Sequence, residues 1–401
     1  MIIGIEAAHA AKDNRTGVEE YCFQIIQELK KQLLRRDVGV VLYSHRLLKG
    51  ELGMVPQNWE IKYLWWPFKK LFNQLRLSWE FLWHRPDVFF APGQLVPFFC
   101  PKNTVAMIHD SAFLAVPGSY TFLGKIYLKW MNRRIIKVSK IILTSSEFNK
   151  KELIKYYGIS PEKIKVIPLA YDKARYYCHS DPEYSGEESL AVGQLSQRFL
   201  TAVRNDRPTK PFIMSVGRLE AKKNTVNIIK AFNLIREKID CQLLLVGKPG
   251  HGYSEVAAEI GRSPYKKDII CSSYVEAGEI AVLLNLAQVF VFPSLYEGFG
   301  LPLLESMARG CPVVASGGGA LEEVGGQAAI YVNPEKVEDI AGAISRLLND
   351  KTLREEKIKA GLERVKNYSW EKTGRQTAEV LEALLSLWIF PASLYKPIIL
   401  L

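Results

Sequence analysis

The sequence predicts an α/β protein with two doubly wound domains in tandem, and three observations point to this fold class. The chain has 401 residues, which is more than one hydrophobic core usually serves. Its composition, 48% hydrophobic and 24% charged, is that of an ordinary globular protein. Short β-branched runs alternate with helical patterns from end to end, as expected for parallel sheets covered by helices.

The first half contains a regular series of predicted elements. It begins with a strand at Ile2–Ala7, a turn at Thr16-Gly17-Val18 and a helix over Glu19–Leu34, where apolar residues recur at helical spacing. Further strands are predicted at Val38–Tyr43, Val88–Ala91, Thr104–Ile108, Lys140–Thr144 and Ile164–Pro168, with a helix at Asn149–Tyr157.

The regular pattern stops between Asp172 and Lys210, where the sequence is polar and contains two prolines. A structureless loop of that length inside one domain would be unusual, so we expect a linker or surface excursion over 172–209. It separates an N-terminal domain, 1–171, from a C-terminal domain, 210–369, and residues 370–401 form a final helix and tail.

A second series of elements follows the linker. Strands are predicted at Phe212–Val216, Gln242–Val246, Asp268–Cys271, Val289–Phe292 and Pro312–Ala315. Helices are predicted at Lys223–Lys238, Glu276–Leu286, Leu301–Arg309, Val337–Leu348 and Leu353–Lys366. In such folds ligands bind at the carboxyl ends of the strands, in the crevice between domains.

The net charge of +11 belongs to one part of the chain. Residues 1–170 contain 25 basic and 14 acidic residues, whereas the remainder is neutral. The six cysteines include no Cys-x-x-Cys pair, which favours a reducing compartment over a disulfide framework or a zinc site. The N-terminus does not have the pattern of a signal peptide, and no stretch is long and apolar enough to span a membrane. We therefore expect a cytoplasmic protein.

A loop between a predicted strand and helix carries two carboxylates. Strand Val289–Phe292 is followed by Glu297 and Gly300, and Glu305 lies about one turn into the next helix. Glycine allows close approach of a ligand, and the free N–H groups of the helix start suit an anion. Carboxylates accept hydrogen bonds from sugar hydroxyls, so this loop suits a sugar attached to a diphosphate. The alternative is a helix cap and an exposed helix residue.

A basic cluster follows the first strand of the same half. In Gly217-Arg218-Leu-Glu-Ala-Lys222-Lys223, Arg218 offers a planar fork and Lys223 a point charge at the carboxyl edge of the sheet. A solvated basic turn is the usual explanation for a single lysine. Together with the acidic loop, however, the cluster predicts a site for an anion.

These residues resemble glycosyltransferase family 4. Glu297 and Glu305 have the Glu-x7-Glu spacing of that family, within Pro293-Ser-Leu-Tyr-Glu-Gly-Phe-Gly-Leu-Pro. The resemblance extends to Thr16-Gly-Val, Ile108-His-Asp, Ser145-Ser-Glu-Phe-Asn-Lys, Ile164–Asp172 and Tyr368-Ser-Trp-Glu, and so covers nearly the whole chain. The N-terminal half is most similar to bacterial mannosyltransferases and related enzymes that build surface polysaccharides.

The resemblance implies the GT-B fold, with two Rossmann-like domains facing a cleft and a C-terminal helix that crosses back to the N-terminal domain. It implies a retaining, metal-independent hexosyltransferase that uses a GDP- or UDP-linked sugar as substrate, with mannose favoured, and no cofactor. The acceptor would be a glycan or a lipid-linked glycan in the synthesis of cell-surface polysaccharide.

The same resemblance implies roles for individual residues. Arg218 and Lys223 would neutralise the diphosphate leaving group, Glu297 would contact the sugar hydroxyls, and His109 would position the transferred sugar. The implied donor-binding residues are Glu305 at the ribose, Gly17 and Gly217 near the phosphates, and the backbone of Phe299, Gly300 and Leu301. Fixed cationic charges can stabilise the departing phosphate in place of a metal ion.

The charge surplus coincides with an aromatic stretch. Five of the eight tryptophans lie between Trp59 and Trp83, and apolar residues from Phe68 to Trp83 recur at helical spacing. The basic residues nearby are Lys69, Lys70 and Arg76, and on a second predicted helix Lys125, Lys129, Arg133 and Lys137. Two interpretations stay open: a core-facing helix with a solvated face, or a peripheral membrane surface on the inner face of the plasma membrane. Nucleic acid is not expected, because no binding module is present.

Other functions of this fold would require different residues or motifs. A sugar-nucleotide epimerase would need an acid/base set that we cannot assign, and a glycosidase has no use for a diphosphate site. A nicotinamide dehydrogenase would need Gly-x-Gly-x-x-Gly after a strand, whereas Gly247-Lys-Pro-Gly-His-Gly252 has another spacing. A catalytically degenerate, membrane-associated scaffold is the remaining alternative, and the intact set of candidate catalytic residues counts against it.

Overall fold

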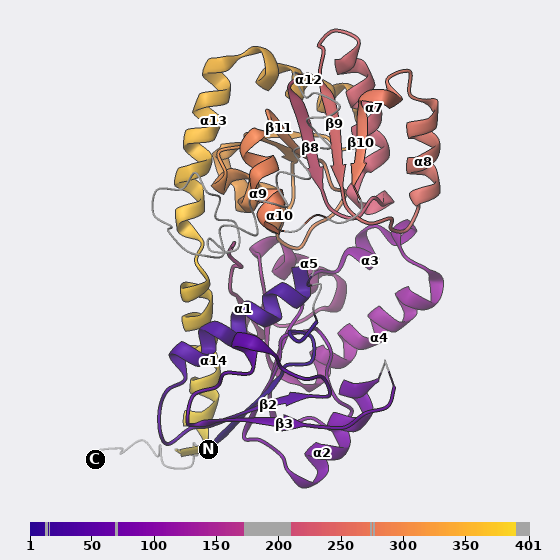
Figure 1. Cartoon of the computed structure of the whole chain (residues 1–401). Helices are drawn as coiled ribbons and strands as arrows, with labels where there is room; N and C mark the ends of the chain where they lie inside the picture. Colours follow the sequence, from indigo (N-terminus) through magenta and orange to yellow (C-terminus); the bar gives the residue numbers. More distant parts are fainter. Residues whose placement is uncertain are drawn as a thin grey trace, which may run out of the picture. The chain divides into compact units, whose positions relative to one another are not determined.

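The computed structural model describes residues 1–12, 15, 17–68, 71–171, 210–272, 275 and 277–389 (Figure 1). The chain forms two compact units. The first contains Met1–Ser111, Ile126–Leu169 and Ser369–Leu401, and the second contains Ala112–Lys125 and Ala170–Tyr368. The predicted linker, 172–209, and the tail after residue 389 lie outside the described residues.

The first unit is built around a seven-stranded parallel sheet with the order β3-β2-β1-β4-β5-β6-β7. Its strands are β1 (Ile2–Glu6), β2 (Gly39–Ser44), β3 (Trp59–Tyr63), β4 (Val88–Ala91), β5 (Asn103–Met107), β6 (Ser139–Thr144) and β7 (Ile164–Val166). All residues of β4 are buried, as expected for a strand covered on both faces.

Helices cover this sheet. They include α1 (Gly17–Gln32), the π-helical turn η2 (Phe72–Arg76), α2 (Leu77–Trp83), α4 (Phe122–Val138), α5 (Glu147–Tyr157) and α14 (Trp370–Ile389), with the 3-10 turns η1 (Gly50–Leu52) and η4 (Pro161–Lys163). The short helix α3 (Ala112–Ala115) and the turn η3 (Pro117–Ser119) precede α4.

The C-terminal helix α14 packs along α1, although the two come from opposite ends of the chain (Figure 1). A Cβ atom on Gly374 would lie 2.4 Å from the Cβ of Glu28, so only glycine allows this approach. The Thr373 hydroxyl donates to the Pro168 carbonyl at 2.7 Å, and the Trp370 ring lies 6.2 Å from that of Tyr21. The predicted return of the final helix to the N-terminal domain is confirmed.

The second unit contains a six-stranded parallel sheet with the order β10-β9-β8-β11-β12-β13. Its strands are β8 (Phe212–Val216), β9 (Gln242–Val246), β10 (Ile269–Ser272), β11 (Val289–Phe292), β12 (Val313–Ser316) and β13 (Ala329–Val332). Its helices include α7 (Thr225–Arg236), α8 (Tyr253–Arg262), α9 (Ala277–Leu286), α10 (Leu301–Ala308), α11 (Ala320–Gly325), α12 (Val337–Asn349) and α13 (Lys351–Arg364), and the 3-10 turn η6 (Ala221–Lys223) precedes α7.

The predicted fold class, two parallel α/β units, is confirmed. The predicted helix near Trp83 needs a correction, because the core-facing interpretation of its apolar residues is wrong. Of those residues Phe72 is buried, whereas Trp79 and Trp83 are 63% and 73% exposed. Core contacts are made instead by Leu77 and Phe81, because the π-helical turn shifts the register of the buried face.

Each sheet reverses its strand order at one point, between β1 and β4 in the first unit and between β8 and β11 in the second. Ligands of open α/β sheets bind outside the carboxyl ends of the strands at such switch points. The topology therefore marks one candidate position in each unit. None of the helices in the described part of the chain combines the length and the apolar character that a membrane crossing requires.

Candidate functional site

The basic cluster and the acidic loop follow adjacent strands. β8 pairs with β11 through Ile213–Val289 and Met214–Phe290, so the segments that leave their carboxyl ends meet at the switch point of the second unit. In addition, the Leu295 amide donates to the Lys222 carbonyl at 2.9 Å. Strand order thus brings together two segments that are distant in sequence.

Lys223 and Glu297 form the charged centre of this position. The lysine Nζ lies 2.5 Å from the glutamate Oε1, and the two side chains are 18% and 11% exposed. The ammonium also lies 4.8 Å from the ring centroid of Phe292, the last residue of β11. Burial raises the pKa of Glu297, but the positive charges of Lys223 and Lys222 lower this pKa by a larger amount. The resulting pKa lies below the ordinary value of a glutamate. Glu297 is therefore an ionised acceptor at neutral pH.

Asn224 holds this arrangement together. Its backbone is left-handed, with φ 59°, and this ends η6 and starts α7. Its Nδ2 donates to the Pro293 carbonyl at 3.2 Å and to the Pro334 carbonyl at 2.6 Å. Because Pro293 begins the acidic loop, the asparagine fixes the basic turn relative to that loop.

Two glycines allow the segment after β8 to pass close to its neighbours. A Cβ on Gly247 would lie 1.8 Å from the Gly217 carbonyl oxygen, and a Cβ on Gly217 would lie 3.4 Å from the Cε of Lys223. Both glycines have positive φ, at +154° and +148°. Arg218 follows and is exposed, and among the described residues no carboxylate is paired with it. Its guanidinium is available to a ligand.

The N-terminal end of α10 is the last part of this candidate site. Gly300 has φ +103°, and a Cβ there would lie 2.3 Å from Leu321 Cδ2. Phe299 is buried and packs edge-on against Tyr368 at 5.8 Å, which anchors the loop, and Leu301 is the first residue of the helix. Glu305 is half-buried in the following turn. The backbone N–H groups of this helix start are suited to an anion.

His109 lies in the first unit, after β5. Its Nε2 is 2.8 Å from the Pro92 carbonyl, so the neutral ring carries its proton there and donates to that oxygen. Its ring packs edge-on against Tyr21 at 5.0 Å, and Asn149 Nδ2 donates to its carbonyl at 3.1 Å. Burial lowers its pKa to about 4. His109 is therefore a fixed, uncharged group at neutral pH.

Gly17 begins α1, close to the switch point of the first unit, and a Cβ there would meet nothing within 4 Å. A buried acid that the sequence analysis did not single out lies at the end of β1. Glu6 is fully buried, accepts from the Ala8 amide at 2.9 Å and lies 2.9 Å from His9 Nδ1. Burial lowers the pKa of His9, and Glu6 raises it by more. A glutamate that ends an otherwise apolar strand is the signal that could have identified it.

The basic residues assigned to a surface have different environments. Lys69 and Lys70 lie outside the described residues, and Arg76 is paired with Glu80 at 3.3 Å. Along α4, by contrast, Lys129, Arg133 and Lys137 are exposed, and Lys125 is half-buried. Within the described ranges no cluster of His, Cys, Asp and Glu side chains is arranged to hold a metal ion.

The sequence matches two families. Residues 15–175 match Glycosyltransferase Family 4, and residues 197–364 match Glycosyl transferases group 1. Among curated relatives, O-antigen chain mannosyltransferase B of Escherichia coli is 27% identical over 323 residues, 79% of each chain. The MMP alpha-(1->4)-mannosyltransferase of Mycolicibacterium hassiacum is 30% identical over 263 residues, 64% of this chain and 57% of the relative.

Solved structures with the same fold include the following two. Sucrose-phosphate synthase of Thermosynechococcus elongatus superposes with a TM-score of 0.72 at 18% identity, covering 96% of this chain and 99% of that one. Anabaena HepE in complex with UDP-glucose superposes with a TM-score of 0.71 at 17% identity, covering 96% and 100%. At these identities the likeness concerns the fold.

Proposed function

Since this chain belongs to glycosyltransferase family 4 and has the two-unit GT-B fold, we propose that it moves a hexose from a nucleotide-diphosphate sugar to a glycan or lipid-linked glycan in cell-surface polysaccharide synthesis. The observation that carries the proposal is the Lys223–Glu297 pair at the switch point of the second unit, near Arg218 in the same turn, which no carboxylate of the described residues pairs with. This position combines cations for a diphosphate with a carboxylate for sugar hydroxyls.

Each group at this position has a distinct task in the proposed reaction. Arg218 and Lys223 hold the diphosphate and stabilise the charge that develops on it as the bond to the sugar breaks. Glu297, kept ionised by its neighbours, accepts hydrogen bonds from the sugar, and the amides at the start of α10 hold the distal phosphate. Glu305 contacts the ribose hydroxyls.

We propose that transfer retains the anomeric configuration and needs no metal ion. The acceptor hydroxyl oxygen forms a bond to the anomeric carbon on the same face from which the phosphate oxygen leaves. The departing phosphate oxygen takes the proton of the acceptor hydroxyl. Two fixed cations provide the stabilisation that a divalent ion would otherwise provide. His109 positions the sugar, because the hydrogen bond to the Pro92 carbonyl fixes its ring and the ring stays uncharged at neutral pH.

Mannose is the favoured sugar. Several relatives, among them the two described above and the serotype-specific mannosyltransferase WbdA of Escherichia coli, carry mannosyl transfer in their names. The identities lie between 26% and 30%, and the proposed donor is a GDP- or UDP-linked mannose.

We further propose that the enzyme works at the inner face of the plasma membrane. An aromatic surface, made by exposed side chains of the β3–α2 segment and of α4, covers part of the first unit. Its members in the first unit are Trp65, Phe68, Trp79, Trp83, Ile126 and Trp130. Gln74 Nε2 donates to the Tyr127 hydroxyl at 3.2 Å and so joins the two segments.

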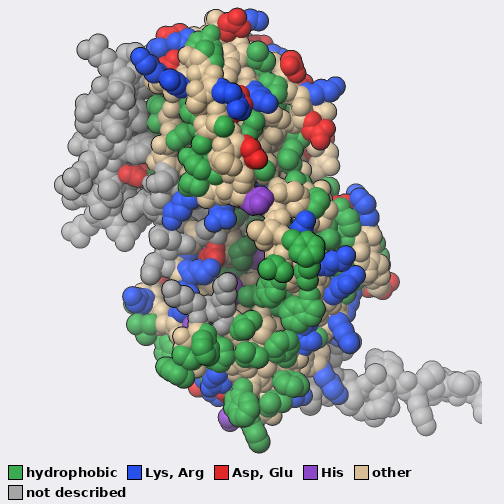
Figure 2. Space-filling model, turned by 90° about the vertical axis from the view of Figure 1, so that its right-hand side faces the viewer, with side chains coloured by type: hydrophobic (Ala, Val, Ile, Leu, Met, Phe, Trp, Pro, Cys, Tyr) green, Lys and Arg blue, Asp and Glu red, His purple; other side chains and the backbone are tan. Residues whose placement is uncertain are grey.

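Charge favours an anionic bilayer as the partner of this surface. In the lower part of Figure 2, hydrophobic side chains gather with Lys and Arg beside them. The exposed Lys129, Arg133 and Lys137 run along α4, next to its aromatic residues, and each contributes about 1 kcal/mol towards anionic lipid. Aromatic side chains bury in the headgroup region while the basic groups contact phosphates.

A screen of nucleoside diphosphates and their sugars tests the proposed activity. The melting temperature should rise with GDP or with UDP, and release of that nucleotide from its mannose conjugate should depend on an acceptor. Arg218→Ala should lower kcat about 10²-fold with little change in acceptor KM. Glu305→Ala should weaken donor binding. A folded protein that binds a nucleotide but turns over no sugar would favour the scaffold, and interconversion of free sugar nucleotides would favour the epimerase.

A further inference from the structure

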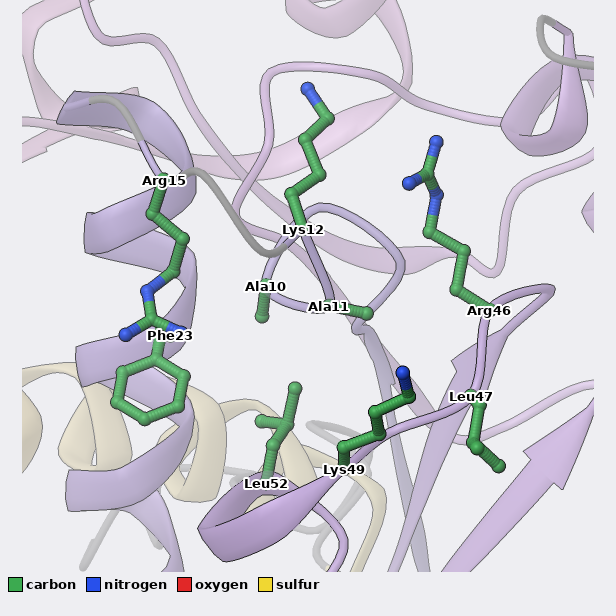
Figure 3. Close-up of a pocket in the computed structure, with 9 residues that line it drawn as sticks. All are labelled: Ala10, Ala11, Lys12, Arg15, Phe23, Arg46, Leu47, Lys49 and Leu52. Carbon is green, nitrogen blue, oxygen red and sulfur yellow. The ribbon is translucent and has the colours of Figure 1, made fainter. Parts of the chain in front are cut away.

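A basic pocket in the first unit is not explained by donor binding. It is a cavity of about 490 Å³ between the segment that follows β1 and the segment that follows β2 (Figure 3). Four basic side chains and several apolar ones line it. The lining residues are Ala10, Ala11, Lys12, Arg15, Phe23, Arg46, Leu47, Lys49 and Leu52.

The basic groups surround one space. In Figure 3, Arg15 lies on one side, over the Phe23 ring, Arg46 and Lys49 lie on the other, and Lys12 stands between them. Leu52 lies below, so the pocket has an apolar base and a cationic rim. This combination suits a ligand with an anionic group attached to a carbon skeleton.

The base of the pocket is held from below. Lys30 of α1 donates to the Glu51 carbonyl at 2.6 Å and to the Leu52 carbonyl at 3.2 Å, which ties η1 to the helix. Burial lowers the pKa of Lys30 to about 8, so the lysine still carries most of its charge at neutral pH. These two hydrogen bonds fix the backbone below the pocket, and a fixed binding surface lowers the cost of binding a ligand.

Two of the four cations are already paired. Lys12 is paired with Glu19, and Arg15 with Glu20 at 3.0 Å, while the Arg15 guanidinium also stacks 3.9 Å above Phe23.

The other two cations are available. Within the described part of the chain no carboxylate is paired with Arg46 or Lys49, and both side chains are exposed. The rim therefore has two positive charges that lack a carboxylate partner among the described residues.

We propose that this pocket binds a phosphate group carried by the acceptor, an inference that rests on the proposed transferase function. Arg46 provides a planar fork and Lys49 a point charge, the two ways in which proteins contact phosphate. A phosphate monoester or a diphosphate carries about two negative charges and so matches the two cations that have no carboxylate partner among the described residues, whereas a carboxylate would leave one uncompensated. The pocket also lies at the carboxyl ends of β1 and β2, beside the switch point where such sheets bind ligands.

Inorganic pyrophosphate is the first probe, added to the whole protein with GDP or UDP in excess so that the donor position is occupied. Calorimetry should detect binding that the double variant R46S/K49S weakens at least tenfold. The matched control is K102S/K165S, which removes two exposed lysines elsewhere in the same unit and should bind as the unchanged protein does. If the double variant folds poorly, R46S alone takes its place, and its affinity for pyrophosphate should lie between those of the unchanged protein and the double variant.

Two further arms identify the source of the phosphate. Glucose 1-phosphate represents a soluble acceptor, and phosphatidylcholine vesicles with phosphatidic acid, compared with phosphatidylcholine alone, represent a lipid-linked one. The probe that R46S/K49S binds more weakly than K102S/K165S does identifies the source of the phosphate group. Equal affinity of both double variants for every probe, or no binding of pyrophosphate by the unchanged protein, would overturn the proposal. Nucleotide binding in the same samples reports separately on the transferase function.

Discussion

Glu297 is held ionised by two lysines in a mostly buried position, and this makes it sensitive to a neutral substitution. Glu297→Gln keeps the shape but leaves Lys223 without a counter-charge, so unfolding should become easier by about 1–3 kcal/mol. Because the carboxylate would also contact the sugar, kcat should fall about 10²-fold. Chemical denaturation and steady-state kinetics measure the two effects.

Glu363→Gln is the matched control, because Glu363 pairs with Lys366 at 2.6 Å on an exposed surface, where such pairs contribute little to stability.

The contribution of Glu297 to stability also depends on pH. Its pKa in the folded protein lies below the ordinary 4.5, so unfolding takes up a proton. The stability difference between the unchanged protein and Glu297→Gln should be complete well above pH 4.5 and should shrink as the pH falls below it. A difference that stays constant down to pH 3 would contradict the assignment.

His109 should respond to acid in its own way. Its pKa is about 4 in the folded protein against 6.5 for an unperturbed histidine, so the unfolded chain binds more protons between these values. Stability should therefore be highest above pH 6.5 and should fall by up to about 3 kcal/mol as the pH drops to 4. Denaturation midpoints of the unchanged protein and His109→Gln, compared from pH 7.5 to 4.5, test this. Parallel curves for the two proteins would show that His109 titrates normally.

At the scale of elements, the start of α10 depends on one glycine. Gly300→Ala places a methyl group 2.3 Å from Leu321 Cδ2 at φ +103°, which should cost about 2 kcal/mol of stability and weaken donor binding. Gly261→Ala is the control, because this glycine lies within α8 and a Cβ there would meet nothing within 4 Å. It should raise stability by up to about 1 kcal/mol. Melting temperatures with and without nucleotide separate the two effects.

Buried strands are predictable from local pattern with their bounds, whereas at the sheet edges β7 and β10 were predicted with shifted bounds and β3 and β13 were not predicted. β4, β8, β9 and β11 have the predicted bounds because continuous apolar runs can only lie inside a covered parallel sheet. β3 was not predicted, although its residues alternate between apolar and charged, because it lies within an aromatic stretch whose periodicity indicates a helix further on. The exposure of Trp79 and Trp83 could not be predicted either, because a π-helical turn leaves helical spacing intact while rotating the buried face.

At the scale of the whole molecule, the charge surplus of the first part becomes a test of membrane attachment. Reversing three charges on α4, in K129E/R133E/K137E, should weaken binding to vesicles containing anionic lipid at least tenfold. K102E/K140E/K165E changes the net charge equally, at exposed lysines outside α4, and should bind much more tightly than the first variant. Cosedimentation with phosphatidylglycerol vesicles measures both. Indistinguishable binding by the two variants would assign the effect to net charge alone.

The candidate site was predictable in its residues but not in its contacts. Arg218, Lys223 and Glu297 stand in motifs that can be recognised locally, whereas the contact between Lys223 and Glu297 depends on β8 and β11 being neighbours. The pocket around Arg46 and Lys49 has no local signal, because each residue is an ordinary basic side chain in its own loop. Strand order, which requires the whole fold, is what gathers them.

The packing of α14 against α1 has a consequence for biosynthesis. The first unit is assembled from both ends of the polypeptide, so a nascent chain cannot complete it until Trp370–Ile389 has left the ribosome. Throughout that interval the surface of α1 that receives Gly374 is uncovered. The strands of each sheet, by contrast, come from one continuous stretch and can pair before α14 emerges. Chaperones that recognise exposed apolar surface should therefore associate with nascent chains that lack α14 and release them once it docks.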